Sequence, residues 1–432
     1  MATGVIERRA SSPARRRALG EPVRLRLVAD QETGRRAPAA AARTRAATLT
    51  AARRDAAALT ALIVSFCVLG LVMVLSSSSV ESIATTGSPW SVVEHQGLWM
   101  GCGAVTFVVA SHCSVELWRR VAVPFLLATG GMLLAVLVRG IGTVTAGSAR
   151  WIDLGPLRLQ PSEFAKFAVV LFIADLLARR AGRTGPRSQV VRPVLIVLGV
   201  FGILIVHQPD LGTAAVIVAV GAVLLCAAGE PFRKVGAIVG LFAATAGAFL
   251  LIEPYGRARL AAWLNPSAHA STTGYQAVQS LMTLGSGHMF GTGIGGSPAA
   301  WGYLPNANSD FIFAIIGNNF GLVGAVAVVG AFCVIGWLGL RIARRSKDRF
   351  ASLVAIGVTT WIVVQAFVNI GGVVGVLPET GIPLPFVSAG GSSLVVLLAA
   401  TGLVVRIARQ PEETTRSTIA AGRAQRRPQP ER

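Results

Sequence analysis

The residues best suited to chemistry lie where polar segments meet apolar runs. Asp310 follows a long glycine-rich stretch and directly precedes the apolar run that begins at Phe311. A carboxylate at the mouth of a membrane helix is costly unless it has a partner or a task. Three further polar segments occupy similar junctions, at 150–166, 208–210 and 378–393. If all four junctions lie on one side of a membrane, the sequence predicts an enzyme site at the bilayer surface.

The segment 150–166 supplies most of the charged candidates. Glu163 and Lys166 are three residues apart, so they share one face of a helix and can form an ion pair. Ser162 suits the N-cap of that helix. Taken alone, the segment fits a helix start with a structural ion pair equally well. Arg150 and Arg158 favour a binding role, because guanidinium groups bind phosphate in bidentate fashion.

Asp310 has two interpretations. With Ser309 it could cap the helix that starts at Phe311, which is the commoner role of an isolated Asp at such a position. Near a cationic cluster, it could instead act as a general base on a hydroxyl. Asp210 also stands at a helix start, and there capping is the preferred interpretation. Amides inside apolar runs are expected to form interhelical hydrogen bonds, and they are Asn318, Asn319, Gln365 and Asn369.

The composition indicates a membrane protein. Of the 432 residues, 53% are apolar and only 14% are charged, which excludes an ordinary soluble domain of this length. The net charge of +20 lies mainly in two basic tails and in short loops between apolar runs. That distribution is typical of the cytoplasmic side of a membrane protein, so we predict no nucleic-acid partner. The five cysteines are dispersed without a CxxC spacing, which argues against a disulfide framework and a metal site.

The apolar runs predict an all-α polytopic membrane protein with about ten transmembrane helices. The region 193–228 has one alternative, a single re-entrant hairpin. Residues 1–55 are predicted to be a disordered basic cytoplasmic tail, 56–406 the transmembrane domain and 407–432 a second cytoplasmic tail. A large extracellular loop, 253–310, precedes the eighth helix. The runs are 56–76, 97–111, 121–138, 162–178, 193–206, 211–228, 235–252, 311–338, 351–376 and 386–405.

Charge sets the predicted orientation. With the N-terminus inside, the cytoplasmic loops hold 14 Lys and Arg residues and the outer segments hold five. The positive-inside rule therefore places both termini in the cytoplasm and all four polar junctions on the outer face. A membrane-impermeant thiol reagent added outside should label a cysteine placed at Ala300 and should not label one at Ser346.

The glycine-rich stretch contains GTGIGG at 291–296, which matches the GxGxxG pattern. No buried strand precedes it and no ribose-binding acid follows at a suitable distance, so we reject a dinucleotide site. The glycines are expected to permit tight turns and the close approach of substrate or helices. From the residues alone, the chain has an outer site for an anionic, lipid-linked substrate.

Five ordered motifs then point to a known family. They are GSARWIDLGPLRLQPSEFAK, QPDLGTA, YQAVQSLMTLGSGHMFGTGIG, LPNANSDFIFAIIG and LPETGIPLPFVSAGGSS. In wording and order they resemble the SEDS family, the FtsW/RodA peptidoglycan glycosyltransferases. The resemblance covers 56–406 and leaves out both tails. SGHMFGTGIG and the Arg-rich tails are more similar to the division branch, FtsW, than to the elongation branch, RodA.

The resemblance implies an enzyme of the plasma membrane and the division septum that polymerises lipid II on the outer face. Asp310 falls on the family's essential acid, the expected general base. Arg158, Glu163 and Lys166 fall on its LRxQPSExxK pattern and would form the phosphate-facing part of the cavity. Arg150 is a further candidate for substrate binding, chosen from its charge and position and not from the resemblance. The implied partners are lipid II, a class B penicillin-binding protein transpeptidase, other divisome proteins and membrane lipids. The resemblance implies no definite cofactor, and it leaves open whether the enzyme uses a divalent cation.

The sequence departs from the family pattern near the site. These departures leave the reaction class intact and put its electrostatics and metal dependence in doubt. Two other functions compete with the enzyme: a lipid II flippase and a division scaffold that recruits a transpeptidase. A flippase should have polar groups at both faces or inverted repeats, and a scaffold gives the outer cluster no role. The departures are Asn306, Asn308, Asn318, Asn319, Glu379 and Ala389.

Overall fold

The structure is a computed structural model, and it is mostly helical. The chain divides into two units, Met1–Arg54 and Asp55–Arg432, and the second contains the site. Ala300, chosen above for labelling, lies outside the described residues. The structure describes residues 21–138, 140–145, 148–155, 157–180, 188–296 and 303–425.

Each of the ten predicted apolar runs overlaps a separate long helix, although 386–405 begins before the helix Gly391–Gln425 and 351–376 ends after the helix Arg349–Val373. Among the described residues, six helices are long and apolar enough to cross a membrane, and 191–206 and 211–227 are shorter apolar helices. The chain is therefore a multi-pass membrane protein, and a total of ten spans stays a prediction. The long helices are α1 (Glu21–Thr86), α2 (Ser91–His112), α3 (Val115–Leu137), α4 (Pro161–Arg180), α5 (Ser188–Val206), α6 (Leu211–Ala227), α7 (Phe232–Ile252), α10 (Ile312–Arg345), α11 (Arg349–Val373) and α12 (Gly391–Gln425).

The predicted disorder of the two tails stays a prediction, and the described part of each tail lies in a helix. α1 begins at Glu21, and α12 continues to Gln425. Both segments are rich in Ala and Arg, which have high helix propensity, so a helix that starts in the bundle can extend through them. The predicted domain boundaries at 55 and 406 stay predictions.

A small sheet corrects the all-α prediction. The strands are β1 (Gly142–Thr145), β2 (Ser148–Leu154) and β3 (Leu157–Leu159), paired antiparallel in the order β1-β2-β3. They lie between α3 and α4, in a segment assigned to a loop. Strands of three to seven residues carry too little alternation to stand out beside the strong apolar runs.

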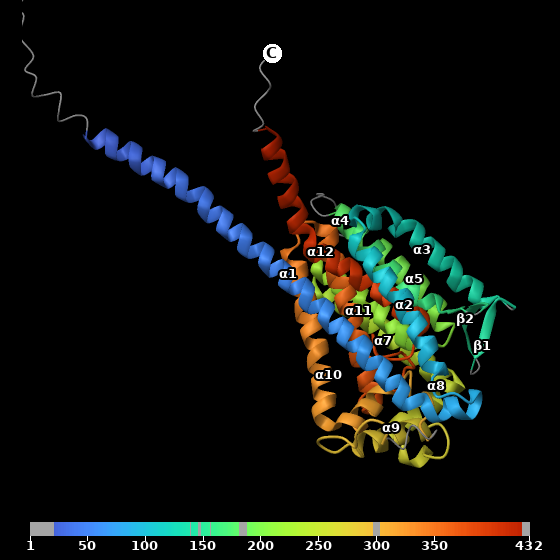
Figure 1. The fold of residues 1–432 in the computed structure, drawn as a ribbon. Helices are drawn as coiled ribbons and strands as arrows, with labels where there is room; N and C mark the ends of the chain where they lie inside the picture. The colour runs from blue at the N-terminus through green and yellow to red at the C-terminus, as the bar shows by residue number, and fades with distance from the viewer. Residues whose placement is uncertain are drawn as a thin grey trace, which may run out of the picture. The chain divides into compact units, whose positions relative to one another are not determined.

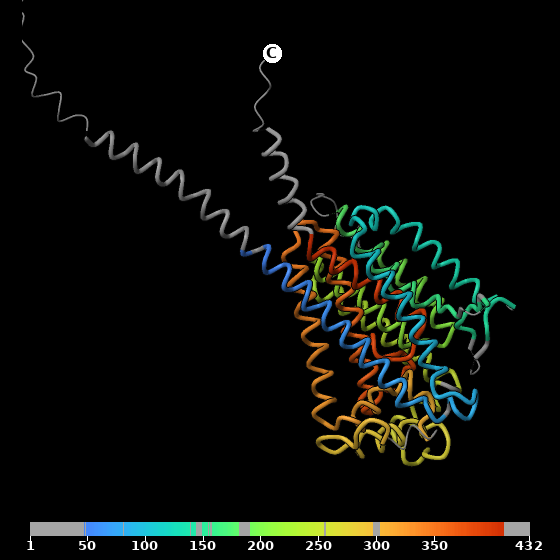
Figure 2. The backbone as a smooth tube through the Cα atoms, in the orientation of Figure 1, coloured from blue at the N-terminus to red at the C-terminus, as the bar shows by residue number. Residues whose placement is uncertain are grey.

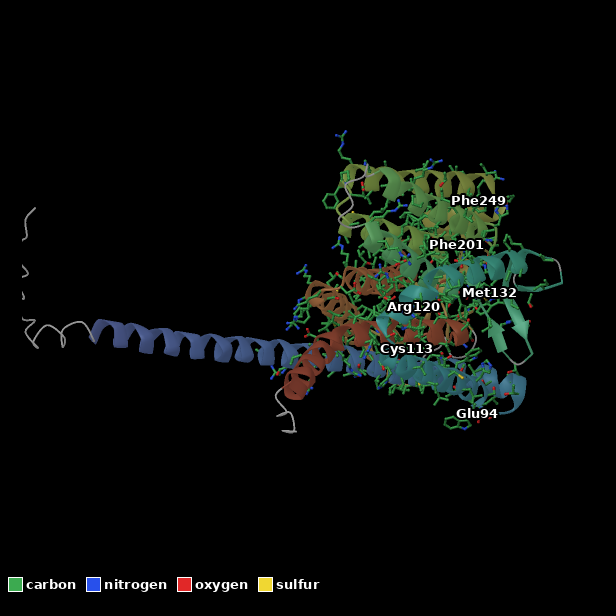
Figure 3. The ribbon with its side chains drawn as sticks, turned by 90° about the horizontal axis from the view of Figure 1, so that it is seen from above. Glu94, Cys113, Arg120, Met132, Phe201 and Phe249 are labelled. Carbon is green, nitrogen blue, oxygen red and sulfur yellow. The ribbon has the colours of Figure 1, made fainter. Side chains whose placement is uncertain are left out.

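The helices of the second unit differ in burial. α4 and α11 run through its interior, and most of the residues on them are buried. α7 lies at the edge, where Figure 3 labels Phe249, and Val235 is its one buried residue. Figure 2 shows the same helices as a single trace, with α11 and α12 passing through the bundle. This arrangement leaves α7 with few neighbours beside the site.

Among the described residues between α7 and α10 there are three short helices. They are α8 (Pro254–Leu264), η2 (Ser267–His269) and α9 (Tyr275–Gly285). Figure 1 shows α8 and α9 at one end of the bundle, near the start of α10. The predicted loop 253–310 is therefore helical in part, and its extracellular position stays a prediction.

Candidate active site

Asp310 lies one residue outside the N-cap of α10. The helix begins at Ile312, its N-cap is Phe311, and no side chain hydrogen-bonds to that cap. Asp210, by contrast, is the N-cap of α6, and its Oδ1 accepts a hydrogen bond from the backbone N–H of Thr213 at 3.0 Å. The capping interpretation is therefore confirmed for Asp210 and wrong for Asp310. The Asp310 carboxylate does not cap α10, and a hydrogen bond from the Ser309 side chain to it acts to lower its pKa.

Two other segments fix the backbone around Asp310. Asn369 Nδ2, on α11, donates to the carbonyl oxygens of Asp310 and Ile382, each at 2.8 Å. The Ser388 hydroxyl donates to the Ser309 carbonyl. Asn369 thus joins α11 to two segments outside helices, and not to another helix as expected. Because α11 and the segment before α12 both hold this turn, the position of Asp310 is set by residues far away in the sequence.

The charges around Asp310 come from several elements. Burial raises the pKa of Asp310 to about 6, while the nearby charges of Arg259 and Arg150 act to lower it and that of Asp210 to raise it. Burial also raises the pKa of Glu379 to about 7, with the Asp310 charge adding to the shift and Arg259 opposing it. A carboxyl group with such a pKa can take up a proton near neutral pH.

A cavity of about 420 Å³ is lined by Glu379, and Asp310 is not among its lining residues. Its walls are mostly apolar, with Phe242, Phe249 and Leu250 on α7, and Arg259 and Glu379 give it a charged part. Ligand pockets of this kind combine an apolar wall with a few convergent polar groups. The lining residues are Val206, His207, Pro209, Leu211, Ala215, Phe242, Ala246, Phe249, Leu250, Glu253, Gly256, Arg259, Leu260, Pro378, Glu379 and Thr380.

Glu163 and Lys166 form the predicted pair, deep inside the protein. Lys166 Nζ donates to Glu163 Oε1 at 2.8 Å and to Gln365 Oε1 at 2.6 Å, and both charged side chains are 1% exposed. Ser393 donates to Glu163 Oε2 at 2.9 Å. The helix begins at Pro161, so Ser162 is not its N-cap. Protein groups compensate both charges, as burial requires.

The two arginines are placed differently. Arg150, on β2, donates from Nε to the Gln208 carbonyl at 2.8 Å, and its charge acts on Asp310. Arg158, on β3, pairs with Asp153 at 3.1 Å, lies over the Trp151 ring and is about half exposed. The structure therefore brings Arg150 to the carboxyl group and gives Arg158 a surface position. Their binding of substrate stays a prediction, as does that of Glu163 and Lys166.

A break in α10 receives the glycine-rich loop. Gly321 has a φ of 68°, so the helix's own hydrogen bonds are interrupted there. The carbonyls of Asn318 and Asn319 accept from the backbone N–H groups of Thr292 and Gly293, at 2.9 and 3.2 Å. In return, Leu322 and Val323 donate to the carbonyls of residues 288 and 289, at 2.9 and 3.2 Å. These four bonds to the loop take the place of two helix bonds, from residues 322 and 323 to the carbonyls of 318 and 319. A Cβ atom at Gly291 would lie 2.1 Å from the Asn319 carbonyl oxygen, which confirms that the glycines permit close approach.

The sequence does not indicate Arg259 as a site residue, because it is only one of the five basic residues in the predicted outer segments. Its place beside Asp310 depends on how α8 folds back, which no local pattern indicates. Glu379 was noted as a departure without a role. Among the described residues, no group of three or more His, Cys, Asp or Glu side chains could hold a metal ion.

The sequence profile of the FtsW, RodA and SpoVE family, described as "Cell cycle protein", matches residues 57–413. The chain belongs to this family. The chain is 39% identical over 355 residues to "Probable peptidoglycan glycosyltransferase FtsW" of Mycobacterium tuberculosis, covering 82% of this chain and 68% of the relative. It is 35% identical over 343 residues to "Stage V sporulation protein E" of Bacillus subtilis, covering 79% and 93%. The resemblance seen in the motifs is confirmed.

Solved structures show the same FtsW/RodA fold. One comes from a study titled "Structural coordination of polymerization and crosslinking by a peptidoglycan synthase complex", with a TM-score of 0.67 and 27% identity. It covers 82% of this chain and 97% of the solved chain. The rod shape determining protein RodA of Thermus thermophilus matches with a TM-score of 0.62 and 25% identity, covering 82% and 96%.

Proposed function

We propose that this FtsW/RodA family member is a peptidoglycan glycosyltransferase that polymerises lipid II for cell-wall synthesis in division. The observation that carries the proposal is Asp310, whose carboxylate caps no helix and whose pKa is raised to about 6. Relatives named as probable peptidoglycan glycosyltransferases support the reaction class.

Asp310 acts as the general base. The sugar 4-hydroxyl of an acceptor lipid II gives its proton to the carboxylate, and its oxygen attacks the anomeric carbon of the donor glycan. The bond from that carbon to the pyrophosphate oxygen breaks, and undecaprenyl pyrophosphate leaves. An uncharged hydroxyl is a weak nucleophile, so a base of this pKa supplies a large part of the rate.

The cavity supports a lipid-linked substrate. Phe242, Phe249 and Leu250 of α7 offer an apolar wall to a prenyl chain, and Arg259 and Glu379 contribute its charged part. A lipid-linked substrate matches this cavity, because its hydrocarbon tail is apolar like the wall and its head is charged like the part that contains Arg259 and Glu379. Since α7 has few buried contacts, the lipid can enter between it and α6 without disrupting the core.

Cations near Asp310 stabilise the leaving pyrophosphate. Arg259 and Arg150 both act on the Asp310 carboxylate electrostatically, so their positive charge reaches the reacting centre. Arg158 binds the outer part of the phosphate-bearing head. Lys166 and Glu163, fully buried, hold Gln365 and the start of α4 beneath the site.

The site faces outward and the tails are cytoplasmic in this proposal, as the loop charges favour. The partner is a class B penicillin-binding protein, whose transpeptidase crosslinks the new strand at the septum. The similarity to a chain of a peptidoglycan synthase complex, from a study of polymerisation and crosslinking, supports such a partner.

The test is polymerisation by the purified full chain together with its transpeptidase partner. In proteoliposomes with lipid II, without ATP or an ion gradient, glycan strands should appear on gels. Lipid II that crosses the bilayer without strand formation would make the chain a flippase. Neither activity, from a folded protein that still binds its partner, would leave the scaffold role.

A further inference from the structure

Glu379 is an unexplained carboxyl group inside the proposed site. It lies between α11 and α12 and lines the cavity together with Arg259. Its Oε1 is buried and has no hydrogen-bond partner among the described residues. A buried polar atom without a partner costs free energy, so such a group needs an explanation. The cavity that it lines offers one, a ligand that supplies the missing hydrogen bond.

The segment that carries Glu379 lies directly against Asp310. A Cβ atom added to Gly381 would stand 3.7 Å from Asp310 Oδ2, and Gly381 has a φ of 70° that favours glycine. Asn369 ties the Asp310 and Ile382 carbonyls to one amide group. Glu379 is two residues before Gly381. The segment that contacts Asp310 therefore also brings Glu379 to the cavity.

The two carboxyl groups hold their protons with different strength. The pKa of Glu379, about 7, lies above that of Asp310, about 6, partly because the Asp310 charge disfavours a second negative charge. Between these values Asp310 is mostly ionised and Glu379 mostly protonated. Two carboxyl groups separated in this way can divide the roles of base and acid. The charged groups that bear on the pair are Arg259, Arg150 and Asp210, and His207 and Glu253 also line the cavity.

We propose that Glu379 is the general acid of the transfer reaction, which protonates the pyrophosphate oxygen as the glycosyl bond breaks. This rests on the proposed function. Asp310 takes the proton of the acceptor hydroxyl, and the hydroxyl oxygen forms the new bond to the anomeric carbon. The electron pair of the broken carbon–oxygen bond goes to the pyrophosphate oxygen, which receives the Glu379 proton. Asp310 then passes its proton to Glu379, so both groups return to their starting states without any other reactant.

The experiment is a pH–rate profile of strand synthesis by the full chain with its transpeptidase partner. For the parent, the rate should rise as Asp310 ionises through pH about 6 and fall as Glu379 ionises through pH about 7. Glu379→Gln, which is nearly isosteric, should lose the alkaline limb and about 10²-fold in rate, because pyrophosphate already leaves well. Glu379→Asp should recover part of the rate and restore the limb.

Glu94→Gln is the matched control, because Glu94 is an exposed carboxyl group in the first turn of α2 and does not line the cavity, and it should keep both limbs of the profile. An alkaline limb retained in Glu379→Gln, with a rate within about twofold of the parent, would overturn the acid role and leave the glycosyltransferase standing. Loss of the limb at an unchanged rate would also overturn it, because Glu379 would then only tune Asp310. A parent that makes no strand at any pH would instead overturn the proposed function, and this inference with it.

Discussion

Gln365 and Asn369 lie one turn apart on α11, and each contacts the surroundings of one acidic residue. Gln365 lies beside the Glu163–Lys166 pair, and Asn369 lies beside Asp310. Gln365 accepts from Lys166, which also donates to Glu163, and Ser393 donates to the second Glu163 oxygen. Asn369 donates to the backbone carbonyl of Asp310 and not to its carboxylate. The protein's own hydrogen bonds and the Lys166 charge compensate Glu163. Asp310, by contrast, has a raised pKa and is the residue to which we assign the reaction. The difference separates a group that supports the site from one that reacts.

The sharpest test of this comparison is Asp310→Asn. Asparagine keeps the size and removes the proton acceptor, so strand synthesis should fall by about 10²–10⁴-fold. Folding should not suffer. Because the folded pKa of about 6 lies above the usual 3.8, the folded state retains a proton that the unfolded state loses, and stability falls as pH rises through that window. At neutral pH the variant should melt at or slightly above the parent.

Strand synthesis and melting are measured on the same preparations. Equal polymerisation by parent and Asp310→Asn would remove the base from the mechanism. A melting temperature many degrees lower would show that the carboxylate supports the fold, and the contrast with Glu163 would disappear.

The second prediction tests the supporting role of the Glu163–Lys166 pair. Lys166→Met leaves Glu163 as an uncompensated buried charge, which costs about 3–5 kcal/mol of unfolding free energy. Adding Glu163→Leu removes that charge and should recover most of the melting temperature, together with part of the strand synthesis. A double variant that folds normally and makes no strand would contradict the supporting role and return Lys166 to direct substrate binding.

The sequence located much of the fold for a physical reason. Membrane helices are local patterns of apolar residues, so all ten long helices could be found without knowing their neighbours. The break at Gly321 could not, since its missing hydrogen bonds are replaced by a loop about 30 residues away.

The site was predicted unevenly. Asp310 and the Glu163–Lys166 pair could be found because each lies at a helix start, where charge has local meaning. The meeting of Arg259, Asp310 and Glu379 depends on α8, α10 and the segment before α12 folding together. No short-range pattern encodes that arrangement.

The third prediction concerns the loop that bonds to α10 at its break near Gly321. Gly291 and Gly293 have similar φ values, 85° and 87°, but a Cβ atom at Gly291 would lie 2.1 Å from the Asn319 carbonyl oxygen and one at Gly293 would touch nothing. Gly293→Ala should therefore cost about 1–2 kcal/mol of stability from its backbone alone. Gly291→Ala should cost clearly more and reduce strand synthesis. Equal melting temperatures for the two variants would show that the loop does not pack on α10 in this way.

The smallest effect is expected at Arg158, which marks the outer limit of the site. It is about half exposed and pairs with Asp153, so Arg158→Ala should change the unfolding free energy by less than about 1 kcal/mol. If Arg158 binds the phosphate-bearing head, the KM for lipid II should rise severalfold while kcat stays near the parent value, since the contact is equal in ground and transition states. Asp153→Asn removes the same ion pair without removing the arginine, and its KM should not rise. A rise in KM for both variants would trace the effect to the β2–β3 pairing, and no rise in either would place Arg158 outside the binding site.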